Sequence, residues 1–237
     1  MRNTLTIARK EFKSYLTSPM AYVVIGIFLV LTGVFFGTSS STYLETSIRG
    51  VWDFWGALFL MAFTALITMR LIAEEKKLGT LELLLTAPVR DSEIIVGKFL
   101  GSLGIFVVIL LLTLYYPLLL IIFGDPDLSP IGTGYLGIFL FGTTCLAIGI
   151  FASSVTSNQI VSAVIAGGIL FALWFIGLAA GYLPEALGEI INYFSLSYYF
   201  PAFISGIVDT RGLVYYLSIT VLFIFLAIRS LENSRWG

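Results

Sequence analysis

Six long apolar stretches restrict what this chain of 237 residues can fold into. They lie at roughly residues 20–38, 52–69, 99–123, 135–153, 160–181 and 212–228. Each is long enough to cross about 30 Å of hydrocarbon as a helix. Charged residues make up only 11% of the chain, against about a quarter of a soluble domain. The sequence therefore predicts an all-α polytopic membrane protein, with residues 1–237 forming a single transmembrane domain.

Basic residues are concentrated on one side of this arrangement. With a cytoplasmic N-terminus, the N-terminal arm, the loop after the second stretch and the C-terminal tail hold all 13 Lys and Arg residues except Arg49 and Arg211. Membrane proteins keep an excess of basic residues in their cytoplasmic loops. Both termini are therefore expected in the cytoplasm.

Residues 2–17 are predicted to form an amphipathic helix on the cytoplasmic membrane surface. The positions that share an apolar arc of about 100° are Leu5, Ala8, Phe12, Tyr15 and Leu16. The basic residues beside this arc are Arg2, Arg9, Lys10 and Lys13. The alternative is a basic arm that is not helical and only sets the topology. A cleaved signal peptide within residues 1–41 is disfavoured, because the apolar run of about 18 residues exceeds the usual 7–15.

Residues 184–208 are expected to form two short helices that dip into the outer leaflet and return. The part 190–208 has no charge and is nearly long enough to span, but a seventh span would place Arg229 and Arg235 outside. Pro184 can start the first helix, and Pro201 is expected to bend the return. The apolar face of the first helix would consist of Leu183, Leu187, Ile190, Ile191 and Phe194.

Residues 70–98 hold five basic and five acidic side chains, between two of the apolar stretches. Leu81, Leu84 and Leu85 fall on one helical face, and Pro88 ends the segment. The pattern predicts a short amphipathic helix that docks with a partner in water. The alternative is a solvated loop whose charges only set the topology, although topology requires basic residues rather than equal numbers of both signs.

Several kinds of chemistry are not supported by the sequence. Gly97-Lys98 lacks the upstream glycine of a phosphate-binding loop, and the chain has no His. No ionisable residue lies in the middle of an apolar stretch, which disfavours an ion-coupled secondary transporter. The single Cys145 rules out a disulfide framework. We therefore expect no catalytic, cofactor-binding or metal-binding residues and no nucleic-acid partner. Pro117 is expected to kink the third stretch.

Residues 73–88 carry the sequence AEEKKLGTLELLLTAP, which resembles the ABC-2 family of ABC-transporter permeases. The similarity extends through residues 97–101, 148–154, 158–160 and 206–211, and so covers essentially the whole chain. Within the family, the gliding-motility permease subunit (GldF type) looks most similar. The resemblance implies a bacterial plasma-membrane permease of exporter or mechanotransmission type. The alternative is a scaffold that moves no solute, anchors an ATPase and passes force to an envelope partner.

The resemblance also implies partners and contact residues. A separate cytoplasmic ABC ATPase would bind ATP and Mg²⁺, and a second permease subunit, identical or related, would complete the pathway. A periplasmic-domain protein of the gliding type is a further implied partner. The residues implied to couple the chain to the ATPase are Glu74, Glu75, Lys76, Lys77, Gly79, Thr80, Leu81, Glu82, Leu84, Leu85 and Pro88. The implied second cytoplasmic contact consists of Ser154, Thr156 and Asn158. Substrate-contacting residues are unassigned.

Overall fold

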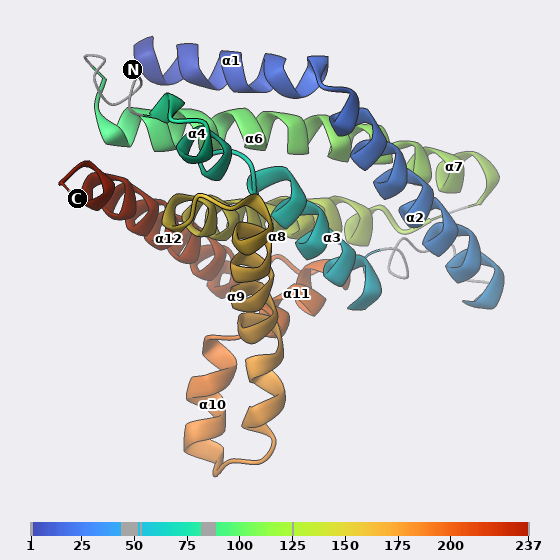
Figure 1. Cartoon of the computed structure of the whole chain (residues 1–237). Coiled ribbons are helices and arrows are strands. Elements are labelled where there is room, and N and C mark those ends of the chain that lie inside the picture. Colours follow the sequence, from blue (N-terminus) through green and yellow to red (C-terminus); the bar gives the residue numbers. More distant parts are fainter. Residues whose placement is uncertain (1, 44–51, 53, 82–88, 125, 237) are drawn as a thin grey trace.

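The computed structural model describes residues 2–43, 52, 54–81, 89–124 and 126–236. In these ranges the regular elements are all helices (Figure 1). They are α1 (Arg2–Thr17), α2 (Pro19–Tyr43), α3 (Phe54–Thr68), α4 (Ala73–Lys77), α6 (Asp91–Thr113), α7 (Tyr115–Phe123), α8 (Leu128–Val155), α9 (Gln159–Ala180), α10 (Glu185–Tyr193), α11 (Leu196–Ile204) and α12 (Thr210–Trp236). Six helical segments are long and apolar enough to cross a membrane. The predicted all-α polytopic fold is therefore confirmed.

Helix α8 forms the centre of the molecule, in contact with α3, α6, α9, α11 and α12. Its glycines allow these neighbours to approach closely. A Cβ atom placed on Gly142 would lie 2.1 Å from the ring of Phe106 in α6, and one on Gly149 would lie 2.0 Å from the Thr68 hydroxyl in α3. The packing of α8 against α3 and α6 therefore depends on the absence of side chains at these positions.

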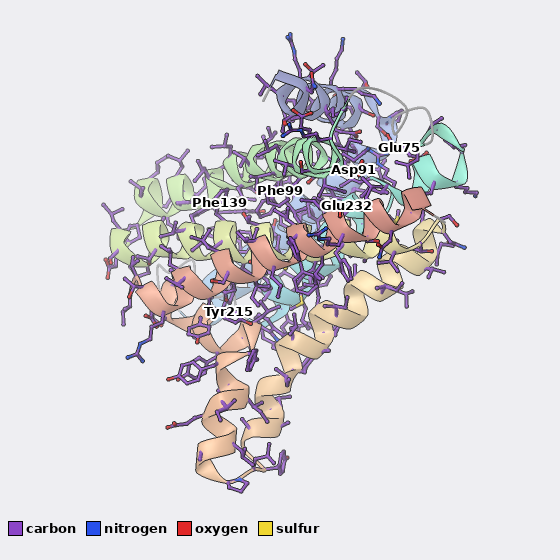
Figure 2. All side chains as sticks on the ribbon, turned by 90° about the vertical axis from the view of Figure 1, so that its left-hand side faces the viewer. Glu75, Asp91, Phe99, Phe139, Tyr215 and Glu232 are labelled. Atoms are coloured by element: carbon purple, nitrogen blue, oxygen red, sulfur yellow. The ribbon has the colours of Figure 1, made fainter. Side chains whose placement is uncertain are left out.

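Helices α2, α9 and α12 lie at the periphery and expose apolar side chains such as Val30, Val164 and Val221. Helix α9 diverges from the central helices, and together with α10 it projects from the body of the molecule in both views (Figures 1 and 2). In water such surfaces would be unfavourable, whereas lipid or a second protein chain can cover them. The periphery is that of a membrane protein.

The third span bends where the sequence predicts it. Helix α6 ends at Thr113, and α7 begins at Tyr115. Pro117 has no N–H group to donate to the carbonyl of Thr113, four residues earlier. The hydroxyl of Tyr135 in α8 donates to this carbonyl instead, over 2.9 Å. The kink expected at Pro117 is thus confirmed, and a neighbouring helix satisfies the freed carbonyl.

The start of the third span differs from the expectation. Helix α6 begins at Asp91, eight residues before the predicted 99, so the last part of segment 70–98 is helical. The backbone N–H of Arg90 donates to the carboxylate of Glu93 over 3.3 Å, an interaction typical of a helix N-terminus. The charges that lower the hydropathy of this segment are therefore part of the helix itself.

The segment before the last span forms two nine-residue helices, α10 and α11. Each is about 14 Å long, too short to cross a bilayer. Pro184 precedes α10 as expected, but the break between the two helices lies at 194–195, and Pro201 lies inside α11. The hydroxyl of Tyr215 donates to the carbonyl of Phe194 (2.6 Å), which fixes this turn to α12. The expectation that Pro201 bends the return is therefore wrong.

Candidate functional site

Four parts of the chain meet at the end of the molecule that carries both termini. They are α1, α4, the loop between α8 and α9, and the end of α12 (Figure 1). Figure 2 looks onto this end and places Glu75 of α4, Asp91 at the start of α6 and Glu232 of α12 on it. The charged segment around α4 therefore lies close to the loop between α8 and α9 and to the C-terminal end of α12.

The first turn of α4 is completed by a residue of α8. The hydroxyl oxygen of Ser153 accepts hydrogen bonds from the backbone N–H groups of Ile72 and Ala73, both over 3.0 Å. The same hydroxyl donates to the carbonyl of Met69 over 3.2 Å. The first N–H groups of a helix have no partner within it and require an external acceptor. The five-residue helix α4 is therefore anchored to the end of α8.

Lys76 connects α4 in turn to the C-terminal ends of α8 and α12. Its ammonium group donates to the carbonyl of Ser154 and, over 3.0 Å, to the hydroxyl of Ser234. The hydroxyl of Ser230 also donates to the Ser154 carbonyl, over 3.1 Å. A cation at the last carbonyls of a helix is favourable because these groups carry a partial negative charge. Displacement of α4 would break contacts with both helices.

A buried lysine joins α4 to α1 and α6. Lys98 of α6 is 1% exposed, and its ammonium forms ion pairs with Glu11 of α1 (2.8 Å) and Glu75 of α4 (2.9 Å). Two carboxylates thus share one ammonium. Among the described residues, the second carboxylate oxygen of Glu75 has no hydrogen-bond partner although it is buried. Buried ion pairs are costly to break, because the remaining group keeps an uncompensated charge.

Helix α1 packs along α6 through three glycines of α6. A Cβ atom would lie 2.8 Å from the Ile7 side chain if placed on Gly97, and 2.6 Å from Glu11 if placed on Gly101. At Gly104 it would lie 3.0 Å from the ring of Phe12. The helix expected over residues 2–17 is present, but its direction follows α6 (Figure 1). Its location on the membrane surface stays a prediction.

The predicted apolar face of α1 is divided by this packing. Ala8 and Tyr15 are buried, whereas Leu5 is 70% exposed. The Tyr15 hydroxyl donates to the carbonyl of Ile67 over 2.7 Å, and the guanidinium carbon of Arg70 lies 4.6 Å from the centre of the Tyr15 ring. Burial raises the pKa of the Tyr15 phenol well above its usual range, so the group remains a neutral donor.

The structure locates seven of the eleven residues expected to couple the chain to an ATPase. Glu74, Glu75 and Lys76 are partly buried, whereas Lys77, Gly79 and Thr80 are exposed. Gly79 has a φ angle of 69°, a left-handed conformation that suits glycine. Leu81 is buried in the core. The other four, Glu82, Leu84, Leu85 and Pro88, lie outside the described residues.

The residues expected to form a second cytoplasmic contact do not share one environment. Ser154 is buried, and its hydroxyl donates to the carbonyl of Phe151. Thr156 is half-buried and Asn158 is exposed. The Asn158 side chain accepts from the N–H of Ile160 over 2.9 Å and so caps α9. Of the three, Ser154 therefore has no side-chain surface for a partner.

Sequence reasoning missed three residues at this end. The sequence does not indicate that Lys98 is buried and paired, and it does not single out Glu11 or Leu78. The spacing of Gly97, Gly101 and Gly104 is the signal that could have indicated close packing of a second helix here. Leu78 is 67% exposed, which is unusual for a large apolar residue beside charged ones in water.

These features define a six-span membrane protein with a charged end built from widely separated parts of the chain. Residues 38–229 match the family model described as ABC-2 family transporter protein. The match covers most of the chain, which therefore belongs to the ABC-2 family. The protein is a transmembrane subunit of an ABC transporter, a class that generally works with an ATPase subunit and is itself generally non-catalytic. The comparison with curated proteins gave no match.

Proposed function

We propose that this chain is the permease subunit of an ABC transporter of exporter or mechanotransmission type, driven by a separate cytoplasmic ATPase through the segment around α4. The observation that carries the proposal is the set of contacts of α4. Within eight residues, Met69 to Lys76, the chain bonds to the ends of α8 and α12, and Glu75 pairs with Lys98 of α6. A force applied to α4 would therefore reach the central helix directly.

Rigid-body motion is the transmission that such contacts support. Packed helices move as units because their interfaces do not deform continuously. Helix α8 touches six other helices, α4 among them, so its displacement would move the spans packed against it. ATP and Mg²⁺ would bind to the ATPase, and no group on this chain is proposed to hold them.

The surface proposed to meet the ATPase combines exposed residues of α4 and the α8–α9 loop. Lys77 and Leu78 follow each other at the end of α4, and Asn158 is exposed in the loop. Leu84 and Leu85 are proposed to extend this surface on the strength of the family resemblance, whereas Leu81, predicted on the same face, is buried in the core. A small apolar contact with a charged rim is typical of a transient protein interface.

The placement proposed is multi-pass in a bacterial plasma membrane with both termini cytoplasmic. Both ends of the described chain lie on the same side of the molecule as α4, which supports this orientation (Figure 1). Asp91–Phe123 has 33 residues, about 50 Å as a helix. This exceeds the hydrocarbon thickness of about 30 Å, so the first turns of α6 can extend into the cytoplasm together with α1.

A second permease subunit, identical or related, is proposed to cover the exposed apolar surface. The projecting part of α9 and α10 exposes Leu178, Leu187, Ile190 and Phe194. Gliding motility, with a periplasmic-domain partner, is a finer proposal that rests only on sequence resemblance. The alternative scaffold without cargo would keep the ATPase contact but lack a continuous cleft between two subunits.

The test compares two aspartate variants in the proposed ATPase surface with one at the opposite end. In Leu78→Asp and Leu84→Asp, a charge enters a contact that excludes water, and retention of the ATPase in a pull-down should fall at least about tenfold. ATP hydrolysis coupled to the permease should fall in parallel, with normal membrane abundance. Leu128→Asp, at an equally exposed leucine at the start of α8, serves as the control. Unchanged ATPase binding by both variants would remove the proposed role from this segment.

A further inference from the structure

A cleft of about 110 Å³ opens between α1, α2, α3, α4 and α6, and Gln159 at the start of α9 also lines it. Its walls are apolar side chains from three spanning segments, namely Val24, Ile25, Phe63, Leu66, Ile105 and Ile109. Leu66 is also 45% exposed on the surface of the molecule, so the cleft is open to the outer surface of the spans. The volume corresponds to about four water-sized groups. The cleft accommodates the first carbons of an alkyl chain, and the other carbons of that alkyl chain would lie outside the cleft.

The mouth of the cleft carries two opposite charges. Arg70 and Glu74 both line it. The backbone N–H of Glu74 donates to the carbonyl of Arg70 over 3.3 Å, so the two residues are held close along the backbone. A cation and an anion therefore line the same apolar cleft.

Arg70 has donors to offer to a ligand. Its guanidinium lies over the Tyr15 ring, and one N–H group donates to the hydroxyl of Ser18 over a long 3.4 Å. A guanidinium carries five N–H donors in a plane, and its geometry matches a phosphate group. Within the part of the chain that the structure describes, Arg70 forms no ion pair with a carboxylate.

The geometry points to a site for one phospholipid of the cytoplasmic leaflet whose headgroup carries a phosphate and a primary ammonium, namely a phosphatidylethanolamine. This inference rests on the membrane placement proposed above. Arg70 would bind the phosphate, Glu74 would accept hydrogen bonds from the ammonium, and one acyl chain would enter between Val24, Phe63 and Ile105. The polar mouth lies at the α4 end of the spans, which is the headgroup level of that leaflet.

The pair of charges discriminates between headgroups. Glu74 disfavours a purely anionic lipid such as phosphatidylglycerol, because the carboxylate gains no cationic partner and faces a second negative charge. A choline headgroup has no N–H to donate to Glu74. Loss of a charge-assisted hydrogen bond corresponds to about tenfold in affinity. The site is therefore expected to prefer phosphatidylethanolamine over both other lipids by about that factor.

The test measures lipid binding to the purified, delipidated full chain by native mass spectrometry. The probes are dioleoyl-phosphatidylethanolamine, dioleoyl-phosphatidylglycerol and dioleoyl-phosphatidylcholine, each titrated separately. Glu74→Gln should abolish the preference for phosphatidylethanolamine over phosphatidylglycerol, and Arg70→Gln should weaken the binding of both. Val24→Trp fills the cleft and should weaken all three, whereas Val164→Trp, at an exposed position on α9, should leave the titrations unchanged.

Two results would overturn the inference. One is equal affinity of the wild-type chain for phosphatidylethanolamine and phosphatidylglycerol. The other is competition by free phosphoethanolamine at the concentrations at which the lipid binds, which would show that the acyl chain contributes nothing. The assay requires no ATPase, so a retained lipid preference together with failed ATPase pull-downs would contradict the proposed function alone. Lost preference with intact ATPase binding would contradict the lipid site alone.

Discussion

Lys98 places a positive charge inside the packed region where α1, α4 and α6 meet. Replacing it with methionine leaves Glu11 and Glu75 close together without a cation. We expect Lys98→Met to lower the free energy of unfolding by about 3–5 kcal/mol, because a broken buried ion pair leaves uncompensated charge. Thermal unfolding of the purified chain in detergent measures this loss.

Arg229 supplies the matched control for this prediction. It forms an ion pair with Glu232 over 2.7 Å, but its side chain is 61% exposed. Solvent screens such a pair, and Arg229→Met should unfold at nearly the wild-type temperature. If Lys98→Met unfolded at the same temperature as Arg229→Met, the cluster of Lys98, Glu11 and Glu75 would contribute little to stability. A triple variant that also replaces Glu11 and Glu75 with glutamine should recover much of the loss.

At the scale of elements, the bend between α6 and α7 depends on a hydrogen bond from another helix. Tyr135→Phe removes the donor to the Thr113 carbonyl and leaves this group without its partner in α8. We expect a loss of about 1–2 kcal/mol in the free energy of unfolding. Tyr182→Phe, at a tyrosine that is 92% exposed, serves as the control in the same denaturation series. Identical stability of the two variants would argue against this role for Tyr135.

Helix boundaries were predicted well where the apolar stretch ends at the helix end. They were predicted poorly where side-chain hydrogen bonds determine the helix end. Helix α9 was expected at 160–181 and extends over Gln159–Ala180. Helix α6 begins eight residues before its expected start because Arg90 and Glu93 cap it. A hydropathy reading treats Asp91 and Glu93 as loop residues, although acidic residues in the first turn stabilise a helix. The turn at 194–195 depends on Tyr215 of α12, which no local pattern reveals.

At the scale of the whole molecule, the orientation in the membrane can be tested directly. A reporter that is active only outside the cytoplasm, fused after Gly237, should be silent. In a Cys145→Ala background, single cysteines at Tyr182 and Thr210 should both react with an impermeant reagent added from outside. Both positions flank α10 and α11, which are too short to cross. Reaction of one cysteine from each side would require a seventh span.

The sequence predicted six spans from apolar length, together with the basic residues that disfavour a seventh span at 190–208. It did not predict which distant residues meet. Ser153 bonds to Ile72 across 81 positions, and Lys98 pairs with Glu11 across 87. Periodicity tells which face of a helix is apolar, but it does not tell which helix covers that face. The candidate site consists mainly of such long-range contacts, so its charged residues were found and their partners were not.

Synthesis from the N-terminus gives these contacts an order in time. Ile72 and Ala73 are made 81 and 80 residues before Ser153, the residue that accepts their N–H groups. A helix of five residues is not stable by itself. In the proposed orientation, a nascent chain that ends before α8 would carry an unformed α4 on the ribosome side of the membrane. The region proposed to receive the ATPase would mature only after α8 has inserted, so incomplete subunits would not recruit it.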